Sequence, residues 1–482
     1  MDLNGCCLDV GSPKPWYRIT IPRPSFHIEK GGLSYFSKHK YNIKMSLNKK
    51  EPIRFIDLFA GIGGIRLGLE LAIKAAGYKS KCVFTSEIKN HAVKILKQNH
   101  PKDKITGDIT KVDAKSIPDF DILCGGFPCQ AFSSAGKGDG FADTRGTLFF
   151  DVERIILEKN PKGFILENVE GLVGHDGGNT LDVILGNLRA AKYKVSYNVL
   201  NSVDFGIPQE RKRIYIVGIK ENLCSEEISL ENFPHTHKNL GSILESGKPT
   251  SDSEFVSLLL KKYTIEELAG KAIKDKRGGS ANIHSWDLEI KGSVSDEEKK
   301  LLNLLLTERR KKKWAEIIGI KWMDGMPLTK EQIETFYEND DLQNMLDDLS
   351  EKGYVKFEHP KKQITEEHTA PNGKLVKTYR RVYDTSKPKG YNIVAGKLSF
   401  EVGKILSPKE VAPTLVATDM QHLFVPDGNG LRTFTLREGL RLFGYPESFK
   451  FDIDKPDGFD LLGNTVAVPV IKAVAKRLIE KL

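Results

Sequence analysis

The sequence has few cysteines, and their spacing matches neither a metal site nor a disulfide framework. Six occur among 482 residues, without the paired spacing of zinc ligands or the density of a small secreted scaffold. This pattern indicates a reducing compartment such as the cytoplasm and no bound metal. Cys82 and Cys124 are predicted to be small buried apolar residues. The six are Cys6, Cys7, Cys82, Cys124, Cys129 and Cys224.

Long apolar runs and internal repeats are also missing. No stretch approaches the length that spans a bilayer, and the first residues lack the apolar core of a secretory signal. We therefore expect no membrane partner. A hydrophobic content of 39% and a charged content of 28% are typical of a globular protein, and 482 residues are enough for two or more packed units. The net charge of +9 is compatible with a polyanionic partner, although composition alone is weak support for one.

The first 51 residues show little periodicity and contain a proline-rich stretch at 13–24. Met45 precedes SLNKKEPIRF, which resembles a natural protein start. Residues 1–51 are therefore predicted to be a leader without regular structure, with residues 1–44 an over-extended reading frame.

Residues 53–220 alternate between short apolar strands and amphipathic helices. This alternation predicts an α/β fold with a doubly wound, mostly parallel sheet, whose ligands bind beyond the carboxyl ends of the strands. The predicted strands are 53–59, 81–86, 120–124, 163–166 and 213–218, and the predicted helices are 64–76, 91–98 and 148–158. Residues 461–482 are predicted to form a glycine turn and an amphipathic helix.

A glycine turn follows the first predicted strand in DLFAGIGG (57–64), where Gly61, Gly63 and Gly64 allow close approach of a ligand. The turn departs from the dinucleotide fingerprint, whose last glycine is replaced here by Arg66. Glu87 ends the second strand, where a carboxylate accepts ribose hydroxyls. Asp108 follows the next apparent strand, placed for an adenine amino group. A carboxylate at position 87 disfavours a phosphorylated ligand, so S-adenosylmethionine suits the site better than NADP.

A second set of groups has the chemistry of covalent catalysis. Cys129 follows a strand and a proline in GGFPCQAFS (125–133), and Glu167 and Asn168 end another strand. Arg211 and Arg213 are spaced by two at the start of a strand, so both could point into one cleft. Each feature alone has a simpler interpretation: a loop cysteine, a helix-capping acid, or solvated or paired arginines. Together they supply the thiol, acid and cations that conjugate addition to a pyrimidine requires.

The ordered motifs DLFAGIGG, GDIT, GGFPCQAFS, RGTLFF, ENV, QERKR, LREGLRLFGYP and GNTV resemble those of the C5-cytosine DNA methyltransferases. The resemblance covers residues 53–482 except for a variable region. It implies that the Cys129 thiolate adds to C6 of a flipped-out cytosine, with Pro128 shaping the loop. It further implies that Glu167 holds N3 and the exocyclic amine, Asn168 positions the loop, Arg213 contacts O2 and Arg211 supports a mobile lid at 134–146.

The resemblance also implies a donor pocket for S-adenosylmethionine, with Phe59 against the adenine and Glu87 on the ribose. Some family members have a tryptophan after the ribose acid; Ile88 stands there in this chain, so adenine would meet an aliphatic side chain. The implied donor residues are Asp57, Phe59, Gly61, Gly63, Gly64, Glu87, Ile88, Asp108, Ile109, Leu148, Asn464 and Val466. The implied DNA contacts are Gln130, Ser133, Thr414 and Leu415.

The resemblance assigns residues 52–220 to a catalytic domain that residues 456–482 complete, and residues 221–455 to a smaller target-recognition domain. Within the latter, ERRKKKW (308–314) is predicted to lie on a helix, as a solvated face or as a phosphate contact. Residues 341–357 resemble the helix and wing of a winged helix, and RGGSANIHSW (277–286) could follow a groove.

The implied function is C5 methylation of cytosine in double-stranded DNA by a monomeric bacterial enzyme, cytoplasmic and associated with the nucleoid. A functional pairing with a restriction endonuclease, without direct contact, is expected. Two alternatives stay open: methylation of transfer RNA by a member of the same family, and a catalytically idle DNA-binding regulator.

Overall fold

The computed structural model describes residues 51–128, 148–275, 279, 281–369, 375–394 and 400–482. The chain divides into two units, Met1–Lys44 and Met45–Leu482. The first unit, which contains most of the predicted leader, lies outside the described residues. So do Cys129, Gln130, Ser133 and the predicted lid at 134–146.

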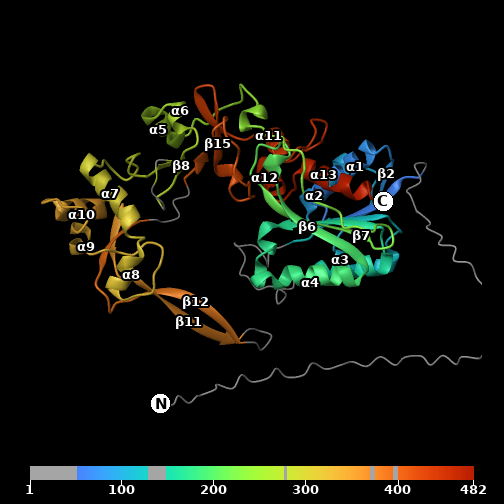
Figure 1. The fold of residues 1–482 in the computed structure, drawn as a ribbon. Helices are drawn as coiled ribbons and strands as arrows, with labels where there is room; N and C mark the ends of the chain where they lie inside the picture. Colours follow the sequence, from blue (N-terminus) through green and yellow to red (C-terminus); the bar gives the residue numbers. More distant parts are fainter. Residues whose placement is uncertain (1–50, 129–147, 276–278, 280, 370–374, 395–399) are drawn as a thin grey trace, which may run out of the picture. The chain divides into compact units, whose positions relative to one another are not determined.

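A seven-stranded sheet organises the amino-terminal half of the second unit (Figure 1), in the order β3-β2-β1-β4-β5-β7-β6. The β1, β2, β3, β4 and β5 strands pair in parallel, whereas β7 is antiparallel to both β5 and β6. The sheet is therefore mixed, with most pairs parallel. Its strands are β1 (Ile53–Leu58), β2 (Ser80–Ser86), β3 (Ile105–Thr106), β4 (Ile122–Gly126), β5 (Gly163–Val169), β6 (Tyr193–Asn201) and β7 (Lys212–Lys220).

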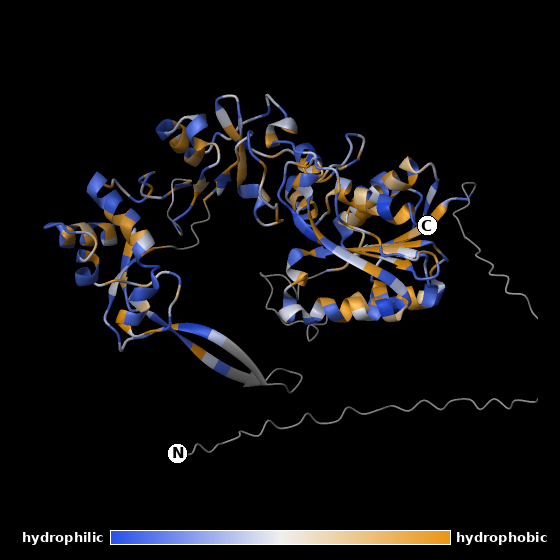
Figure 2. Cartoon of the chain, in the orientation of Figure 1, coloured by the Kyte–Doolittle hydropathy of each residue, from blue (hydrophilic) through white to orange (hydrophobic). Residues whose placement is uncertain are grey.

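Helices cover both faces of this sheet (Figures 1 and 2). The helices α1 (Gly64–Ala75) and α13 (Val468–Ile479) share one hydrophobic core with the sheet, and α3 (Leu148–Lys159) and α4 (Asn179–Ala190) share the other. Gly68 permits the close packing of α1 on α13, because a Cβ at this position would lie 2.5 Å from Cβ of Ile471. The last helix of the chain therefore completes the layer that begins directly after β1.

The carboxyl-terminal helices correct one expectation about long apolar runs. Residues 455–479 are apolar enough to span a bilayer by length and composition, with a mean hydropathy of 1.3. They form two helices, α12 (Lys455–Gly463) and α13, and 72% of the apolar window is buried within the protein. The apolarity of this stretch is explained by packing in the core.

The second half of the chain contains a five-stranded sheet with the order β16-β15-β14-β8-β9. A further hydrophobic core joins this half to α2 (Asn90–Asn99) through Ala92 and Ile95, so the two halves are packed together there. The remaining elements are β8 (Ala272–Ile273), β9 (Asn282–Ile283), β14 (Lys404–Ile405), β15 (Leu423–Asp427), β16 (Gly430–Thr433), α5 (Glu254–Lys262), α6 (Ile265–Leu268) and α11 (Leu436–Arg441).

Residues 286–393 form an insert between β9 and β14 with a hydrophobic core of its own. It contains α7 (Asp296–Glu308), α8 (Lys312–Ile318), α9 (Lys330–Glu334), α10 (Leu342–Glu351), β10 (Val355–Glu358), β11 (Lys361–Thr369), β12 (Leu375–Tyr383) and β13 (Gly390–Ile393). The predicted single helix across ERRKKKW is wrong, because α7 ends at Glu308 and α8 begins four residues later. Arg309, between the two helices, is buried and donates to Asn392 Oδ1 over 2.6 Å, so the run is not one solvated face.

Candidate active site

The site lies at the carboxyl edge of the seven-stranded sheet, where the strand order reverses. From β1 the chain continues to β2 and β3 on one side and returns to β4 on the other. Such a switch point leaves a crevice beyond the strand ends, and most of the predicted site residues with described positions lie around it.

The glycine turn after β1 forms one wall of this crevice. Phe59, Gly61 and Gly63 have φ values of 54°, 54° and 84°, so the chain turns sharply before α1. A Cβ built on Gly61 would meet no atom within 4 Å, so space is open above the turn. Gly64 is different, since a Cβ there would lie 2.6 Å from the Tyr445 hydroxyl and 2.8 Å from a methyl of Val466. The turn therefore needs glycine both for its backbone and for contact with the chain's last segment.

Glu87, at the end of β2, faces the glycine turn. Its Oε2 accepts from the Gly61 amide over 2.7 Å, and its Oε1 accepts from the amides of Ile88 and Lys89. A carboxylate has about four acceptor positions, so these bonds fix its orientation and leave capacity for a ligand. Ile88, beside it, is 70% exposed, unusually high for a large apolar side chain.

Asp108 and Ile109 follow β3. The Asp108 carboxylate is exposed and accepts from the Thr110 amide and hydroxyl, which lower its pKa. Ile109 is buried beneath it. Asn464 and Val466 are brought in by the segment between α12 and α13: Asn464 is exposed at the end of α12, and Val466 is buried against Gly64. Leu148 is half-buried at the start of α3.

Asp57 does not fit its predicted role as a direct donor contact, because its side chain is fully buried within the sheet. Its Oδ1 lies 3.7 Å from the Cys124 thiol, and its Oδ2 has no partner among the described residues. Burial raises the pKa of this carboxyl to about 7, although the nearby Arg66 acts in the opposite direction. Asp57 therefore supports the floor beneath the glycine turn.

The raised pKa of Asp57 predicts a pH-dependent stability. Between pH 4 and 7 the folded protein keeps a proton that the unfolded chain has lost, so stability falls as pH rises through this window. Asp57→Asn removes this titration. Relative to the parent protein, its free energy of unfolding should rise by up to about 4 kcal/mol between pH 4 and 8, at about 1.4 kcal/mol per pKa unit. Denaturant unfolding of both proteins at each pH measures this, and a difference that is constant with pH would refute it.

Buried Glu167 and half-buried Arg213 form an ion pair at the ends of β5 and β7. Arg213 Nε lies 3.2 Å from Glu167 Oε1. Burial raises the pKa of Glu167, while Arg213 and Arg211 act in the opposite direction. Because burial raises its pKa, we expect Glu167 to hold its proton to a higher pH than a solvated glutamate would. Gly126 lies beside it, because a Cβ there would be 3.2 Å from Glu167 Oε2.

Arg211 is buried separately, although the spacing of the two arginines predicted that both could share one cleft. Its guanidinium donates to three backbone carbonyls and stacks on Phe443, whose ring centroid lies 5.2 Å from Cζ. The acceptors are the carbonyl oxygens of Leu415, Gly463 and Thr465, at 3.0, 3.1 and 2.7 Å. Arg211 therefore joins the strand-entry segment to two distant parts of the chain.

Asn168 connects Glu167 to the segment that leads to the predicted nucleophile. Its Nδ2 donates to the Phe127 carbonyl over 3.3 Å, and its Oδ1 accepts from the Val169 amide. Phe127 is buried against Phe149, so the backbone entering Pro128 is fixed on two sides. The next residue, Cys129, lies outside the described residues.

A cavity of about 290 Å³ opens next to the Glu167–Arg213 ion pair. Arg213 lines it together with Val169, Lys212 and Thr414. Thr414 is exposed and lines the same cavity as Arg213. Leu415 is fully buried, so its side chain does not reach DNA in this conformation. Its backbone amide donates a hydrogen bond to Gln209 Oε1.

Gln209 is a structural residue that the sequence interpretation did not single out. Its side chain is fully buried, accepts from the Leu415 amide and donates to the Leu442 carbonyl over 2.9 Å. Its place at the head of the QERKR motif was the available signal.

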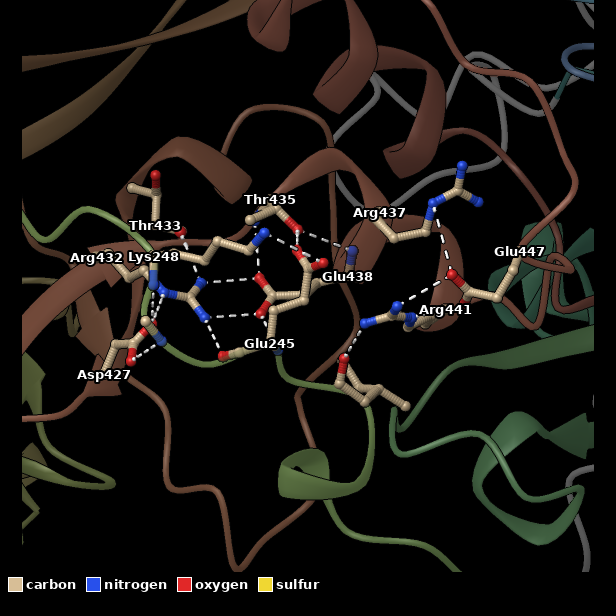
Figure 3. Close-up of polar contacts among 12 residues, drawn as sticks. Glu245, Lys248, Asp427, Arg432, Thr433, Thr435, Arg437, Glu438, Arg441 and Glu447 are labelled. Atoms are coloured by element: carbon tan, nitrogen blue, oxygen red, sulfur yellow. Dashed lines mark hydrogen bonds and ion pairs between the residues drawn. The ribbon is translucent and has the colours of Figure 1, made fainter.

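The LREGL motif takes part in a buried ion-pair network that stabilises the fold (Figure 3). Glu438, fully buried, binds both terminal nitrogens of Arg432 and accepts from the Glu245 amide. Asp427 holds Nε of the same arginine over 2.8 Å. The motif therefore ties α11 to the five-stranded sheet.

The mixed sheet, the glycine turn at its switch point and the acids at its strand ends define an α/β methyltransferase fold. The model of the C-5 cytosine-specific DNA methylase family matches residues 53–480, and the chain belongs to this family. It is a DNA cytosine-5-methyltransferase. The α/β fold class and the family expected from the motifs are both confirmed.

Three curated relatives match nearly the whole chain. The type II methyltransferase M.NlaIV of Neisseria lactamica is 60% identical over 439 residues, covering 90% of this chain and 100% of its own. M.NgoBV of Neisseria gonorrhoeae is 58% identical with the same coverage. M.BanI of Aneurinibacillus aneurinilyticus is 41% identical, covering 89% of this chain and 96% of its own. Among solved structures, the methyltransferase EhMeth of Entamoeba histolytica is 16% identical over 89% of this chain and 98% of its own, with a TM-score of 0.48.

Proposed function

We propose that this enzyme methylates C5 of a cytosine flipped out of double-stranded DNA, with Cys129 as the nucleophile. The observation that carries the proposal is the ion pair between buried Glu167 and half-buried Arg213, beside Asn168 and the backbone entering Pro128. This arrangement offers an acid and a cation to one planar base, next to the backbone that leads to Cys129.

The residues act in a definite order in this proposal. The Cys129 thiolate forms a bond to C6 of the base. The electron pair of the C5–C6 double bond shifts to C4–C5, and that of the C4–N3 double bond shifts onto N3. Glu167 donates its proton or a strong hydrogen bond at N3, where charge develops, and Arg213 binds O2. C5 then takes the methyl group, and the donor would leave as a neutral thioether. A base from solvent removes the C5 proton, N3 returns its proton to Glu167, and the restored C5–C6 double bond expels the thiolate.

S-adenosylmethionine supplies that methyl group as an electrophile on a sulfonium. The donor pocket fits it, because the space above Gly61 is open and Glu87 and Asp108 present carboxylates at successive strand ends. We propose that Glu87 binds the ribose and Asp108 the adenine amine, while Ile88 covers the adenine face. Phe59, Leu148, Asn464 and Val466 complete the pocket.

The relatives' names as type II methyltransferases support a place in restriction-modification. We propose that the enzyme protects host DNA as a monomer, in the cytoplasm at the nucleoid, beside an endonuclease that it does not contact. Residues 221–455 are proposed to select the target sequence, and residues 52–220 with 456–482 to perform the chemistry.

The experiment that tests the function compares two nucleic acids. Purified enzyme receives labelled S-adenosylmethionine with unmethylated duplex DNA or with transfer RNA, and bisulfite sequencing locates the product. The proposal expects label in DNA at one recurring sequence. Label only in RNA would favour the transfer RNA alternative, and label in neither would favour a catalytically idle DNA-binding protein.

A further inference from the structure

The insert at 286–393 has the connectivity of a winged helix. Its elements follow one another along the chain in this order: the extended residue Leu328, α9, α10, β10, the β11–β12 hairpin and β13. Leu328 bridges Tyr391 of β13, and β13 pairs with β10, so these three segments lie side by side with β13 in the middle. The helix expected within 341–357 is α10, whereas the wing is the β11–β12 hairpin at 361–383, outside the expected range.

The second helix of the α9–α10 pair, α10, is poorly suited to lie against DNA. In a helix-turn-helix the second helix enters the major groove, and its outer face meets phosphates at both rims. The outer face of α10 carries Asp341, Asp347 and Glu351, all exposed, and Asp348 beside them is paired with Lys352. Gln343, a side chain that could read a base, is turned to Asp347 and to the Tyr391 hydroxyl.

The hairpin has the opposite character on one of its faces. Directly opposed residues of an antiparallel pair share a face, and the pairs alternate between faces along the ribbon. Lys361 pairs with Tyr383, Gln363 with Arg381, and Thr365 with Tyr379. These six residues, the wing face, include two cations, Lys361 and Arg381. The next pair in register on this side, Glu367 with Lys377, adds one residue of each charge. Tyr379 is 67% exposed and Tyr383 49%, so two aromatic rings are interleaved with the charges.

On the opposite face of the hairpin, the positive charges lie close to carboxylates. Arg380 pairs there with Ile364, and its guanidinium lies 3.8 Å from the carboxylate of Glu366. Lys362, on the same side, lies 3.2 Å from Asp384. Arg381, on the wing face, has no ion-pair partner among the residues that the structure describes.

The base of the hairpin is fixed by hydrogen bonds, so its orientation relative to the insert is set before any partner binds. Glu358 accepts from the Tyr383 hydroxyl and from Asn392 Nδ2, both over 2.8 Å. Asn392 in turn accepts from the buried Arg309. A cavity of about 260 Å³ at this base is lined by Lys361 and Arg381 of the wing face, by Arg309 and Lys356, and by the acids Asp324 and Glu358.

We propose that the insert binds double-stranded DNA through the wing face, with α10 turned away from the phosphates. A two-stranded ribbon fits the major groove, and cations interleaved with aromatic rings suit a phosphate-lined partner. The assignment rests on the proposed function, from which DNA enters as the substrate. It differs from the usual arrangement, in which the helix is the element that enters the groove.

The experiment uses the full-length enzyme and a duplex that the parent protein methylates. Arg381→Glu should weaken DNA binding at least tenfold and lower the salt dependence of the affinity. Its matched control, Arg380→Glu on the opposite face, should bind within threefold of the parent. Asp347→Lys on α10 should also bind within threefold, because its site does not face DNA. The affinity for S-adenosylmethionine, measured by calorimetry, should be unchanged in all three.

Three outcomes would overturn the inference: Arg381→Glu binding within threefold of the parent, equal losses for Arg380→Glu and Arg381→Glu, or a tenfold tightening by Asp347→Lys. The last would place α10 near phosphates. Failure of the proposed function is distinguishable, since the parent protein would then methylate no duplex at all.

Discussion

Glu167→Gln should lower the rate of methyl transfer to duplex DNA by about 10²- to 10⁴-fold, the usual contribution of a positioned proton donor. Glutamine keeps the shape of the side chain and can still donate a hydrogen bond, but it cannot deliver a proton to N3. Glu167 is buried, and burial raises its pKa, so the parent enzyme holds the proton more readily than a solvated glutamate would. Single-turnover kinetics with labelled donor separate the chemical step from DNA binding.

Glu170→Gln is the matched control for this substitution. Glu170 lies three residues away, is exposed and lines the neighbouring cavity, so its loss should leave the single-turnover rate within threefold of the parent. If Glu167→Gln also reacted within threefold of the parent, Glu167 would not be the proton donor.

Arg211→Met should lower the free energy of unfolding by about 3 to 5 kcal/mol, because three carbonyl oxygens in the core lose their charged donor. Methionine fills much of the volume, so the loss reports mainly on hydrogen bonds. The carbonyl oxygens that would lose this donor belong to two separate parts of the chain, Leu415 in one and Gly463 and Thr465 in the other. Hydrogen exchange should therefore accelerate in residues 461–466 as well as around residue 415.

The comparison for Arg211 is Lys212→Met, one residue further on. Lys212 is exposed, so this substitution should change the free energy of unfolding by less than about 0.5 kcal/mol. An unfolding free energy for Arg211→Met within 1 kcal/mol of the parent would show that the carbonyl contacts contribute little to stability.

Much of the site could be predicted from the sequence because its residues stand at strand ends or directly after them. The glycine turn, Glu87 and Glu167 each follow a short apolar run, and parallel strands bring their carboxyl ends to one edge.

Positions set by distant partners could not be predicted in the same way. Arg211 precedes β7, so the alternation of a strand does not yet govern its direction, and its acceptors lie 204 to 254 residues further along the chain. The buried Arg309 side chain donates to Asn392, which is 83 residues further along the chain. Arg309 lies between the two helices into which the basic run is divided. The strand β6 and the helix α4 were missed altogether.

The central claim is that Cys129 attacks cytosine in DNA, and covalent trapping tests it most directly. Duplex DNA containing 5-fluorocytosine at the target position lets the thiol add and the methyl group transfer, but C5 then carries no proton to lose. With S-adenosylmethionine present, the account predicts a protein–DNA adduct with one added methyl group, mapped by mass spectrometry to Cys129 and absent in Cys129→Ala. An adduct at another residue, or efficient methylation of ordinary DNA by Cys129→Ala, would contradict it.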